Sequence, residues 1–117
     1  MKIGELSKRT GITAPTIRFY EQIGLLDARH VRRRDNQYRD YSEEAVEQIQ
    51  IIKEVQAAGF TLAEFRELDA ICRAGEQVAE RASRYLHEKI VVIGVKIGEL
   101  ERVQRYLLTQ LDNLNTR

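Results

Sequence analysis

The sequence predicts a mainly α-helical protein with one small β-hairpin in its N-terminal half and one long helix at its C-terminus. Three observations predict this arrangement. Apolar residues recur at helical spacing through most of the 117 residues. The segment from Val31 to Tyr41 lacks that spacing and has a polar centre. From Leu86 to Leu114, Ile and Leu recur every three or four residues with no proline between them.

The composition fits a folded protein of a reducing compartment. Apolar residues make up 43% of the chain, which is enough for a core. A single cysteine allows neither an intrachain disulfide framework nor a CxxC site, and this suits the cytoplasm. The N-terminal stretch MKIGELSKRTG has no apolar region typical of a signal peptide. The apolar run 90–95 is too short to cross a bilayer, so no membrane partner is expected.

Two short helices joined by a tight turn are predicted at the N-terminus. The first covers residues 3–10 and should end at Gly11, because glycine adopts the left-handed conformation without strain. Thr13 can cap the second helix, and Pro15 is tolerated in a first turn whose N–H groups have no partner. The second helix should run to about Ile23. This spacing is typical of a helix-turn-helix motif.

A small β-hairpin is predicted over about residues 28–41. Its polar centre, residues 35–37, lies between short segments that contain Val31 and Tyr38. Asn36 can adopt a positive φ, as a tight hairpin turn requires. Tyr41 is expected to lie partly in the core.

A third helix should follow, with Ser42 as its N-cap and Gly59 at its end. Glu43 and Glu44 would lie at the positive end of its dipole. The apolar face of this helix is expected to comprise Val46, Ile49, Ile52 and Val55.

A fourth helix has the strongest local start signal in the chain. Thr61 and Glu64 form a capping box, and Phe60 and Phe65 form a hydrophobic staple around it. The helix should end near residues 73–75. Its core-facing positions are expected to be Leu62, Phe65, Leu68 and Ile71.

The last predicted element is one long helix from residue 76 to about Leu114. Heptad a and d positions form the expected dimerisation seam, which comprises Leu86, Ile90, Ile93, Ile97, Leu100, Gln104, Leu107, Leu111 and Leu114. The segment IVVIGVKIG could also be read as a strand, and its two glycines weaken a helix. A single apolar stripe of this length needs a partner, and a second copy is the simplest. Residues 1–75 are therefore expected to form one domain and 76–117 a coiled coil.

The charge is concentrated in the first part of the chain. Residues 1–42 hold nine Lys/Arg and five Asp/Glu, a net of +4, whereas residues 43–117 hold ten and thirteen, a net of −3. A basic head on an acidic body indicates a polyanion at one end, unless the asymmetry is a chance fluctuation.

Candidate DNA contacts lie on the second helix and the hairpin. The N-terminal half of a second helix enters the major groove in a helix-turn-helix, and here it carries Thr16, Arg18 and Tyr20. Arg18 could pair with a base edge or a phosphate, and Tyr20 could donate to a phosphate. Arginine forks also fit phosphate oxygens, and residues 29–41 carry five arginines. The alternative is a solvated charged loop anchored by its tyrosines.

Several motifs resemble the MerR family of bacterial transcription regulators. They are IGELSKRTGITAPTIRFYEQIGLL and then YRDYSEEAVEQIQIIKEVQAAGFTLAEFREL, which together cover residues 1 to about 70. The resemblance implies a homodimer with a winged helix-turn-helix at each end of an antiparallel coiled coil. It further implies an inverted-repeat promoter that the protein distorts, so that RNA polymerase can use it, in response to an effector small molecule.

The resemblance also implies which residues contact DNA. Thr16, Arg18 and Tyr20 would do so from the second helix, and Tyr38 and Arg39 from the wing. The additional wing candidates, in its variable part, are Arg32, Arg33 and Arg34.

Three departures from the family pattern stand out. Asn36 and Gln37 replace the usual glycine before the wing tyrosine, and Asp27 and Ala28 follow GLL where proline is common. The third is that no cysteine stands at the start of the long helix or after it, where the metal-sensing members carry theirs, so no metal and no cofactor are expected.

The effector site is not defined by these motifs. Cys72 could be a small buried hydrophobe beside Leu68 and Ile71, a thiol sensor favoured by Arg73, or a metal ligand shared across a dimer. The two histidines, His30 and His87, are expected at the surface.

No catalytic constellation is present, so an enzyme is not expected. The alternative function is a coiled-coil adaptor whose basic head binds another polyanion or an acidic protein surface.

Overall fold

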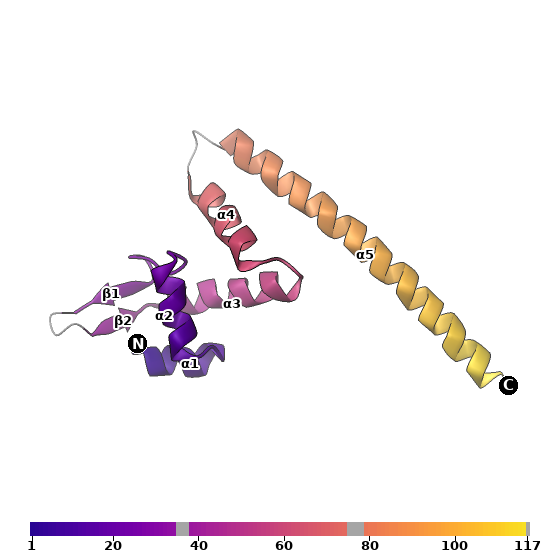
Figure 1. Ribbon diagram of the computed structural model, residues 1–117, viewed down its shortest axis with the longest axis horizontal. Helices are drawn as coiled ribbons and strands as arrows, with labels where there is room; N and C mark the ends of the chain where they lie inside the picture. Colours follow the sequence, from indigo (N-terminus) through magenta and orange to yellow (C-terminus); the bar gives the residue numbers. More distant parts are fainter. Residues whose placement is uncertain (35–37, 75–78, 117) are drawn as a thin grey trace. The chain divides into compact units, whose positions relative to one another are not determined.

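The computed structural model describes residues 1–34, 38–74 and 79–116, which fall into two compact units, 1–67 and 68–117. The fold class predicted from the sequence is confirmed (Figure 1). In chain order the elements are α1 (Ile3–Thr10), α2 (Ala14–Gln22), β1 (Val31–Arg33), β2 (Arg39–Tyr41), α3 (Glu43–Ala57), α4 (Leu62–Arg73) and α5 (Ala79–Asn115).

The turn between α1 and α2 forms as its residues predict. Gly11 ends α1 with a φ of 75°, and its N–H donates to Ser7 O at 2.9 Å. The Ser7 hydroxyl donates to Ile12 O at 2.6 Å and so holds the turn. Thr13 caps α2 by accepting the N–H of Thr16 at 3.4 Å. The helix-turn-helix is therefore fixed by local hydrogen bonds.

The two wing strands pair antiparallel over three residues each. Val31 lies opposite Tyr41, and Arg33 lies opposite Arg39. Beyond the strands, Arg34 N donates to Tyr38 O at 2.8 Å. The predicted turn conformation at Asn36 lies outside the described residues. Because side chains alternate along a strand, Arg33 and Arg39 share the face of the hairpin that carries Val31 and Tyr41.

The core of the first unit packs the helix-turn-helix, the second wing strand and α3 against one another. Its buried residues are Leu6, Ile17, Tyr20, Leu25, Leu26, Tyr41, Ala45, Ile49, Ile52 and Phe65. Val46, Val55 and Leu62 are partly buried against them. Leu68 and Ile71 are only half-buried, so the predicted core face of α4 is buried best near its start. This packing fixes α2 and β2, the two elements that carry most of the candidate site.

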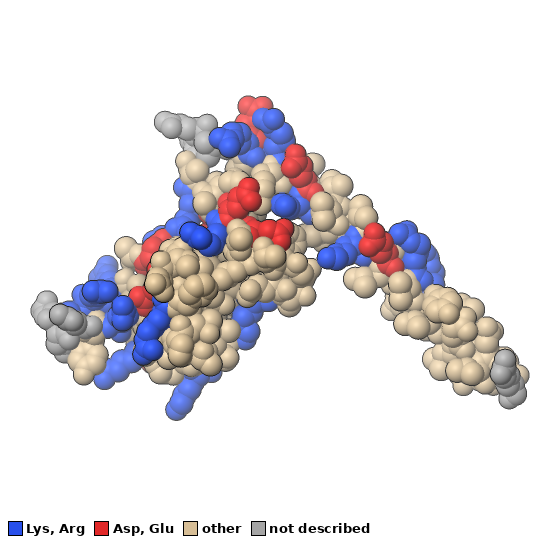
Figure 2. All heavy atoms as spheres, in the orientation of Figure 1, with Lys and Arg blue, Asp and Glu red and all other residues tan. Residues whose placement is uncertain are grey.

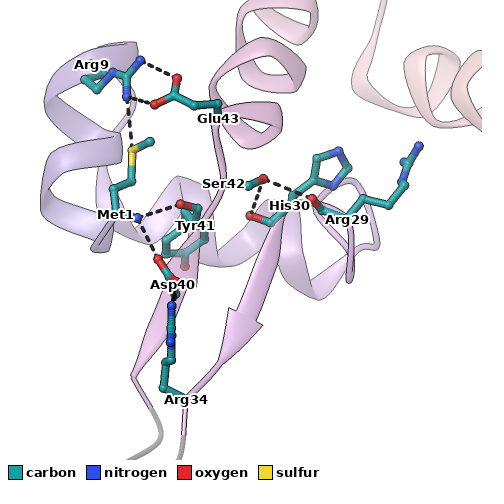
Figure 3. Close-up of polar contacts among 9 residues, drawn as sticks. All are labelled: Met1, Arg9, Arg29, His30, Arg34, Asp40, Tyr41, Ser42 and Glu43. Carbon is teal, nitrogen blue, oxygen red and sulfur yellow. Dashed lines mark hydrogen bonds and ion pairs between the residues drawn. The ribbon is translucent and has the colours of Figure 1, made fainter.

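In the connection into α3, the prediction that Ser42 is the N-cap residue is confirmed but its side chain makes no capping hydrogen bond, and the prediction that His30 lies at the surface is wrong. Ser42 occupies the N-cap, but its hydroxyl lies 3.0 Å from Arg29 O and 3.3 Å from His30 O and donates back into the hairpin (Figure 3). His30 is buried, with 3% of its surface exposed, and its Nδ1 accepts the N–H of Asp27 at 3.0 Å. Asp27 Oδ1 in turn accepts the N–H of Arg29 at 3.0 Å. The departure from the family pattern at Asp27 thus still supports a tight turn into the hairpin.

The start of α4 is as predicted. Thr61 N donates to Glu64 Oε1 at 3.0 Å, and Glu64 N donates to Thr61 Oγ1 at 3.1 Å. This reciprocal pair is a capping box, which satisfies two N–H groups that a helix start leaves free.

The C-terminal element α5 is one continuous helix of 37 residues, about 55 Å long. Gly94 and Gly98 lie within it, so the strand interpretation of this segment is wrong. The seam residues from Ile90 to Leu114 are exposed, as Leu100 at 66% illustrates. The large exposed apolar residues of α5 outside the seam are Val91, Val92, Val95, Val103, Tyr106 and Leu108. Among the described residues, no helix has the length and apolar character that crossing a membrane requires.

Candidate nucleic-acid interface

The outward face of α2 follows from its buried residues. Ile17 and Tyr20 point into the core, at 0% and 5% exposure. The exposed residues of the helix lie at positions i, i+3, i+4 and i+7, which form one face. They are Pro15, Arg18, Phe19 and Gln22. The helix therefore presents Arg18 and an exposed aromatic ring to whatever binds there.

Thr16 and Tyr20, the other two predicted DNA contacts on α2, are less exposed than Arg18. Thr16 is half-buried, and its hydroxyl lies 2.9 Å from that of Thr13. The Tyr20 ring packs in the core, and this burial raises the pKa of its hydroxyl. Any contact of Tyr20 with a ligand must therefore go through the hydroxyl, which stays a hydrogen-bond donor at neutral pH.

Three arginines meet between α2 and the wing. An open hollow of about 370 Å³ is lined by Arg18, Glu21, Gln22, Arg33 and Arg39. The arginines come from α2, β1 and β2, and Glu21 is the one carboxylate in this lining. A cluster with more cations than anions, spread over three elements, is a site for an anionic ligand.

Glu21 ties the helix to the wing. Its side chain is 14% exposed, and its Oε1 accepts a hydrogen bond from the Tyr41 hydroxyl. Its Oε2 lies 2.9 Å from Arg39 Nε, an ion pair without the angles of a hydrogen bond. Burial and the hydrogen bond to Glu21 raise the pKa of Tyr41, whereas nearby Arg39 and Arg18 oppose that rise. Sequence reasoning missed Glu21, because an acidic residue in a basic site gives no signal by spacing.

The arginines of the head differ in their partners. Arg34 Nη2 lies 2.7 Å from Asp40 Oδ2, and Arg9 forms a two-pronged pair with Glu43 at 2.6 and 2.7 Å (Figure 3). Arg29 likewise pairs with Asp27. In contrast, the side chains of Arg18, Arg32 and Arg33 have no ion pair or hydrogen bond within the part of the chain that the structure describes. Figure 2 shows blue side chains gathered over the hairpin.

Asp40 anchors β2, the second strand of the wing. The Met1 amino group donates to Asp40 Oδ1 at 2.8 Å and to Tyr41 O at 2.7 Å (Figure 3). The hydrogen bond from this amino group, followed by the one from Arg34, lowers the Asp40 pKa to about 2. These contacts join residues about 40 positions apart in sequence, so no local pattern could predict them.

The predicted wing tyrosine does face outward. Tyr38 is 55% exposed, and Lys2 Nζ lies 5.0 Å from the centre of its ring. A cation over the ring orients the tyrosine without burying its hydroxyl. Tyr38 therefore remains available as a donor at the edge of the interface.

The candidate effector residues, Cys72 and His87, are both exposed. Cys72 is exposed, so its interpretation as a buried hydrophobe is wrong for this chain by itself. His87 is exposed, as predicted. Within the residues that the structure describes, no cluster of three or more His, Cys, Asp or Glu could hold a metal ion.

Two family models match the chain and overlap in its middle. The model described as MerR HTH family regulatory protein matches residues 1–70. The model described as MerR, DNA binding matches residues 46–110. Together they cover the helix-turn-helix, the wing, α3, α4 and most of α5.

Characterised relatives agree with these models. The mercuric resistance operon regulatory protein of Bacillus cereus is 35% identical over 107 residues, which is 92% of this chain and 80% of that protein. The HTH-type transcriptional regulator HmrR of Rhizobium leguminosarum bv. viciae is 34% identical over 107 residues, which is 92% of this chain and 81% of that protein.

Solved structures share the fold. A MerR family transcriptional regulator from Listeria monocytogenes matches with a TM-score of 0.85 and 26% identity, over 100% of this chain and 87% of that one. HiNmlR, a MerR family regulator that lacks the sensor domain and was solved bound to promoter DNA, matches in fold with a TM-score of 0.76 and 21% identity, over 94% of this chain and 86% of that one. The chain belongs to the MerR family and is a DNA-binding transcription regulator.

Proposed function

We propose that this regulator binds an inverted-repeat promoter as a homodimer and controls transcription by distorting the DNA. The observation that carries the proposal is the convergence of Arg18, Arg33 and Arg39, from three elements, on one hollow. The exposed apolar seam of α5 supports the dimer, because a second copy would cover it, and the dimer would then present two such sites.

In this proposal α2 enters the major groove. Arg18 is exposed and without an ion-pair partner among the described residues, so it can meet a base edge or a phosphate. Thr16 and the Tyr20 hydroxyl contact the backbone beside it. The proposed backbone contacts of the wing are Arg32, Arg33, Tyr38 and Arg39. Arg34 contributes less, because Asp40 already neutralises it.

Dimerisation is assigned to residues 76–117 and DNA binding to residues 1–75. The proposed seam runs antiparallel through Ile93, Ile97, Leu100 and Leu107, with Gln104 as its one polar position. Between residues 90 and 98, exposed valines lie outside the seam, so this part of α5 needs cover on more than one side.

The remaining parts of the proposal concern regulation. RNA polymerase reads the distorted promoter, and the protein acts in the cytoplasm, on the nucleoid, without a catalytic step. An effector small molecule, if one acts, has Cys72 as its one thiol target, because Cys72 is the chain's single cysteine and is exposed.

The test is fluorescence anisotropy with the promoter duplex upstream of the protein's own gene and a scrambled duplex of equal length. Wild type should prefer the promoter duplex, and Arg18→Ala should weaken binding about ten- to a hundredfold, as loss of a charged contact to base or phosphate does. Arg105→Ala, on the exposed surface of α5, removes the same charge outside the head and should leave affinity unchanged. Equal binding to both duplexes, unaffected by Arg18→Ala, would instead favour the adaptor.

A further inference from the structure

Glu21 places a negative charge within the proposed DNA-binding face. It lies in the last turn of α2, where its carboxylate lines the same hollow as Arg18, Arg33 and Arg39. A carboxylate beside arginines that bind phosphate repels DNA. Its presence there therefore has to be explained by what it does for the arginines.

Both oxygens of Glu21 interact with residues of β2. Oε1 accepts from the Tyr41 hydroxyl, and Oε2 lies 2.9 Å from Arg39 Nε. Tyr41 is 1% exposed and anchored in the core, so Glu21 is held by a fixed group. Glu21 in turn fixes the place of Arg39 relative to α2.

The ion pair also sets how Arg39 is presented. Arg39 Nε is buried and faces Glu21, while 37% of the Arg39 side chain is exposed. The terminal Nη atoms of Arg39 make no hydrogen bond among the described residues. A guanidinium held by its Nε leaves its two terminal nitrogens for a second anion, and that pair matches two oxygens of a phosphate.

We propose that Glu21 is a positioning residue, which couples α2 to the wing by holding Arg39 so that its terminal nitrogens meet a DNA phosphate. The inference rests on the proposed DNA binding and adds a role for a residue that itself touches no DNA. The effect it predicts for Glu21→Gln is opposite to the one expected from net charge alone. If the charge of Glu21 were all that mattered, Glu21→Gln would remove a repulsion and tighten binding.

A double-mutant cycle on the promoter duplex tests the inference. Wild type, Glu21→Gln, Arg39→Ala and the double variant are compared by anisotropy across a salt series. Glu21→Gln should weaken binding nearly as much as Arg39→Ala, about tenfold or more. The double variant should be no weaker than Arg39→Ala alone, because the two changes remove the same contact. In each variant the slope of log affinity against log salt should become shallower by about 0.9, the value of one phosphate.

Two controls separate positioning from a general loss of structure. Arg18→Ala should cost as much in the Glu21→Gln background as in wild type, since Arg18 is not held by Glu21. Thermal unfolding followed by circular dichroism reports whether Glu21→Gln still folds at the assay temperature. Tyr41→Phe, which removes the hydrogen bond but keeps the ring, should give a smaller loss in the same direction.

Three results would overturn the inference. One is Glu21→Gln binding as tightly as wild type or more tightly. Another is an Arg39→Ala cost that is unchanged in the Glu21→Gln background. The third is Arg39→Ala alone binding like wild type, since Arg39 would then have no contact to be positioned for. None of these affects the proposed function, which depends on the separate result for Arg18→Ala.

Discussion

Among single residues, the presence or absence of a carboxylate partner separates the arginines of the head. Arg33 and Arg34 are neighbours in sequence, yet Arg34 pairs with Asp40 and Arg33 has no such partner in the described part of the chain. An arginine that is already paired with a carboxylate neutralises a phosphate less fully, so its contact releases fewer of the counterions condensed on the DNA. Arginines at neighbouring positions of the wing can therefore contribute unequally to DNA binding.

Arg33→Ala should weaken binding to the promoter duplex and make the salt slope shallower by about 0.9, since one phosphate contact is lost. Arg34→Ala is the matched control, because it removes the same side chain one residue away. Its effect on the slope should be smaller. Equal slopes for the two variants would show that the Asp40 pair does not survive DNA binding.

The lowered pKa of Asp40 predicts how the stability of the fold depends on pH at the acid end. Its folded pKa of about 2 lies below its ordinary value of 3.8, so folding favours the ionised form. The stabilisation is therefore fully present above about pH 4 and is lost as the pH falls through about 2. A carboxyl titration by NMR should find the midpoint near 2, and Arg34→Ala should raise it part of the way. A midpoint at the ordinary value would mean that the Met1 amino group does not hold Asp40.

At the scale of elements, the start of a helix could be predicted where its capping hydrogen bonds join residues close in sequence. The capping box at Thr61 and the N-cap at Thr13 formed as predicted, because each needs only residues three positions away. Ser42 is the N-cap residue of α3 but makes no capping hydrogen bond, and its hydroxyl donates instead toward the carbonyls of Arg29 and His30. The wing itself was predicted, but the pairing of Arg34 and of Arg39 depends on residues that only the tertiary fold brings near.

Thr61→Ala should lower the free energy of unfolding by about 1 kcal/mol, since it removes the side-chain acceptor at the start of α4. Urea unfolding followed by circular dichroism measures this loss. Ser83→Ala, at an exposed position inside α5, is the control and should not be destabilising. A Thr61→Ala variant as stable as wild type would indicate that the hydrogen bond forms only weakly in solution.

At the scale of the whole molecule, the heptads predicted α5 correctly but could not show what covers it. The seam and the additional valines are exposed in a single chain, and sequence periodicity identifies an apolar face without naming its partner. Cys72 illustrates the same limit, because its neighbours in sequence suggested burial and the structure has it exposed.

Gln104 should set the register of the proposed dimer at a modest cost in stability. Gln104→Leu is therefore expected to raise the melting temperature, measured at fixed protein concentration. Sedimentation equilibrium would show whether the variant stays a dimer. A melting temperature that does not rise would remove this role from Gln104.

In the proposed complex, two copies of the arginine cluster bind one duplex symmetrically. Hydroxyl-radical footprinting of the promoter duplex upstream of the protein's own gene tests it most directly. A symmetric dimer should protect two patches related by a two-fold axis, with centres about one helical turn or a multiple of it apart, and Arg18→Ala should abolish both. A single patch, or protection without symmetry that Arg18→Ala leaves intact, would contradict it.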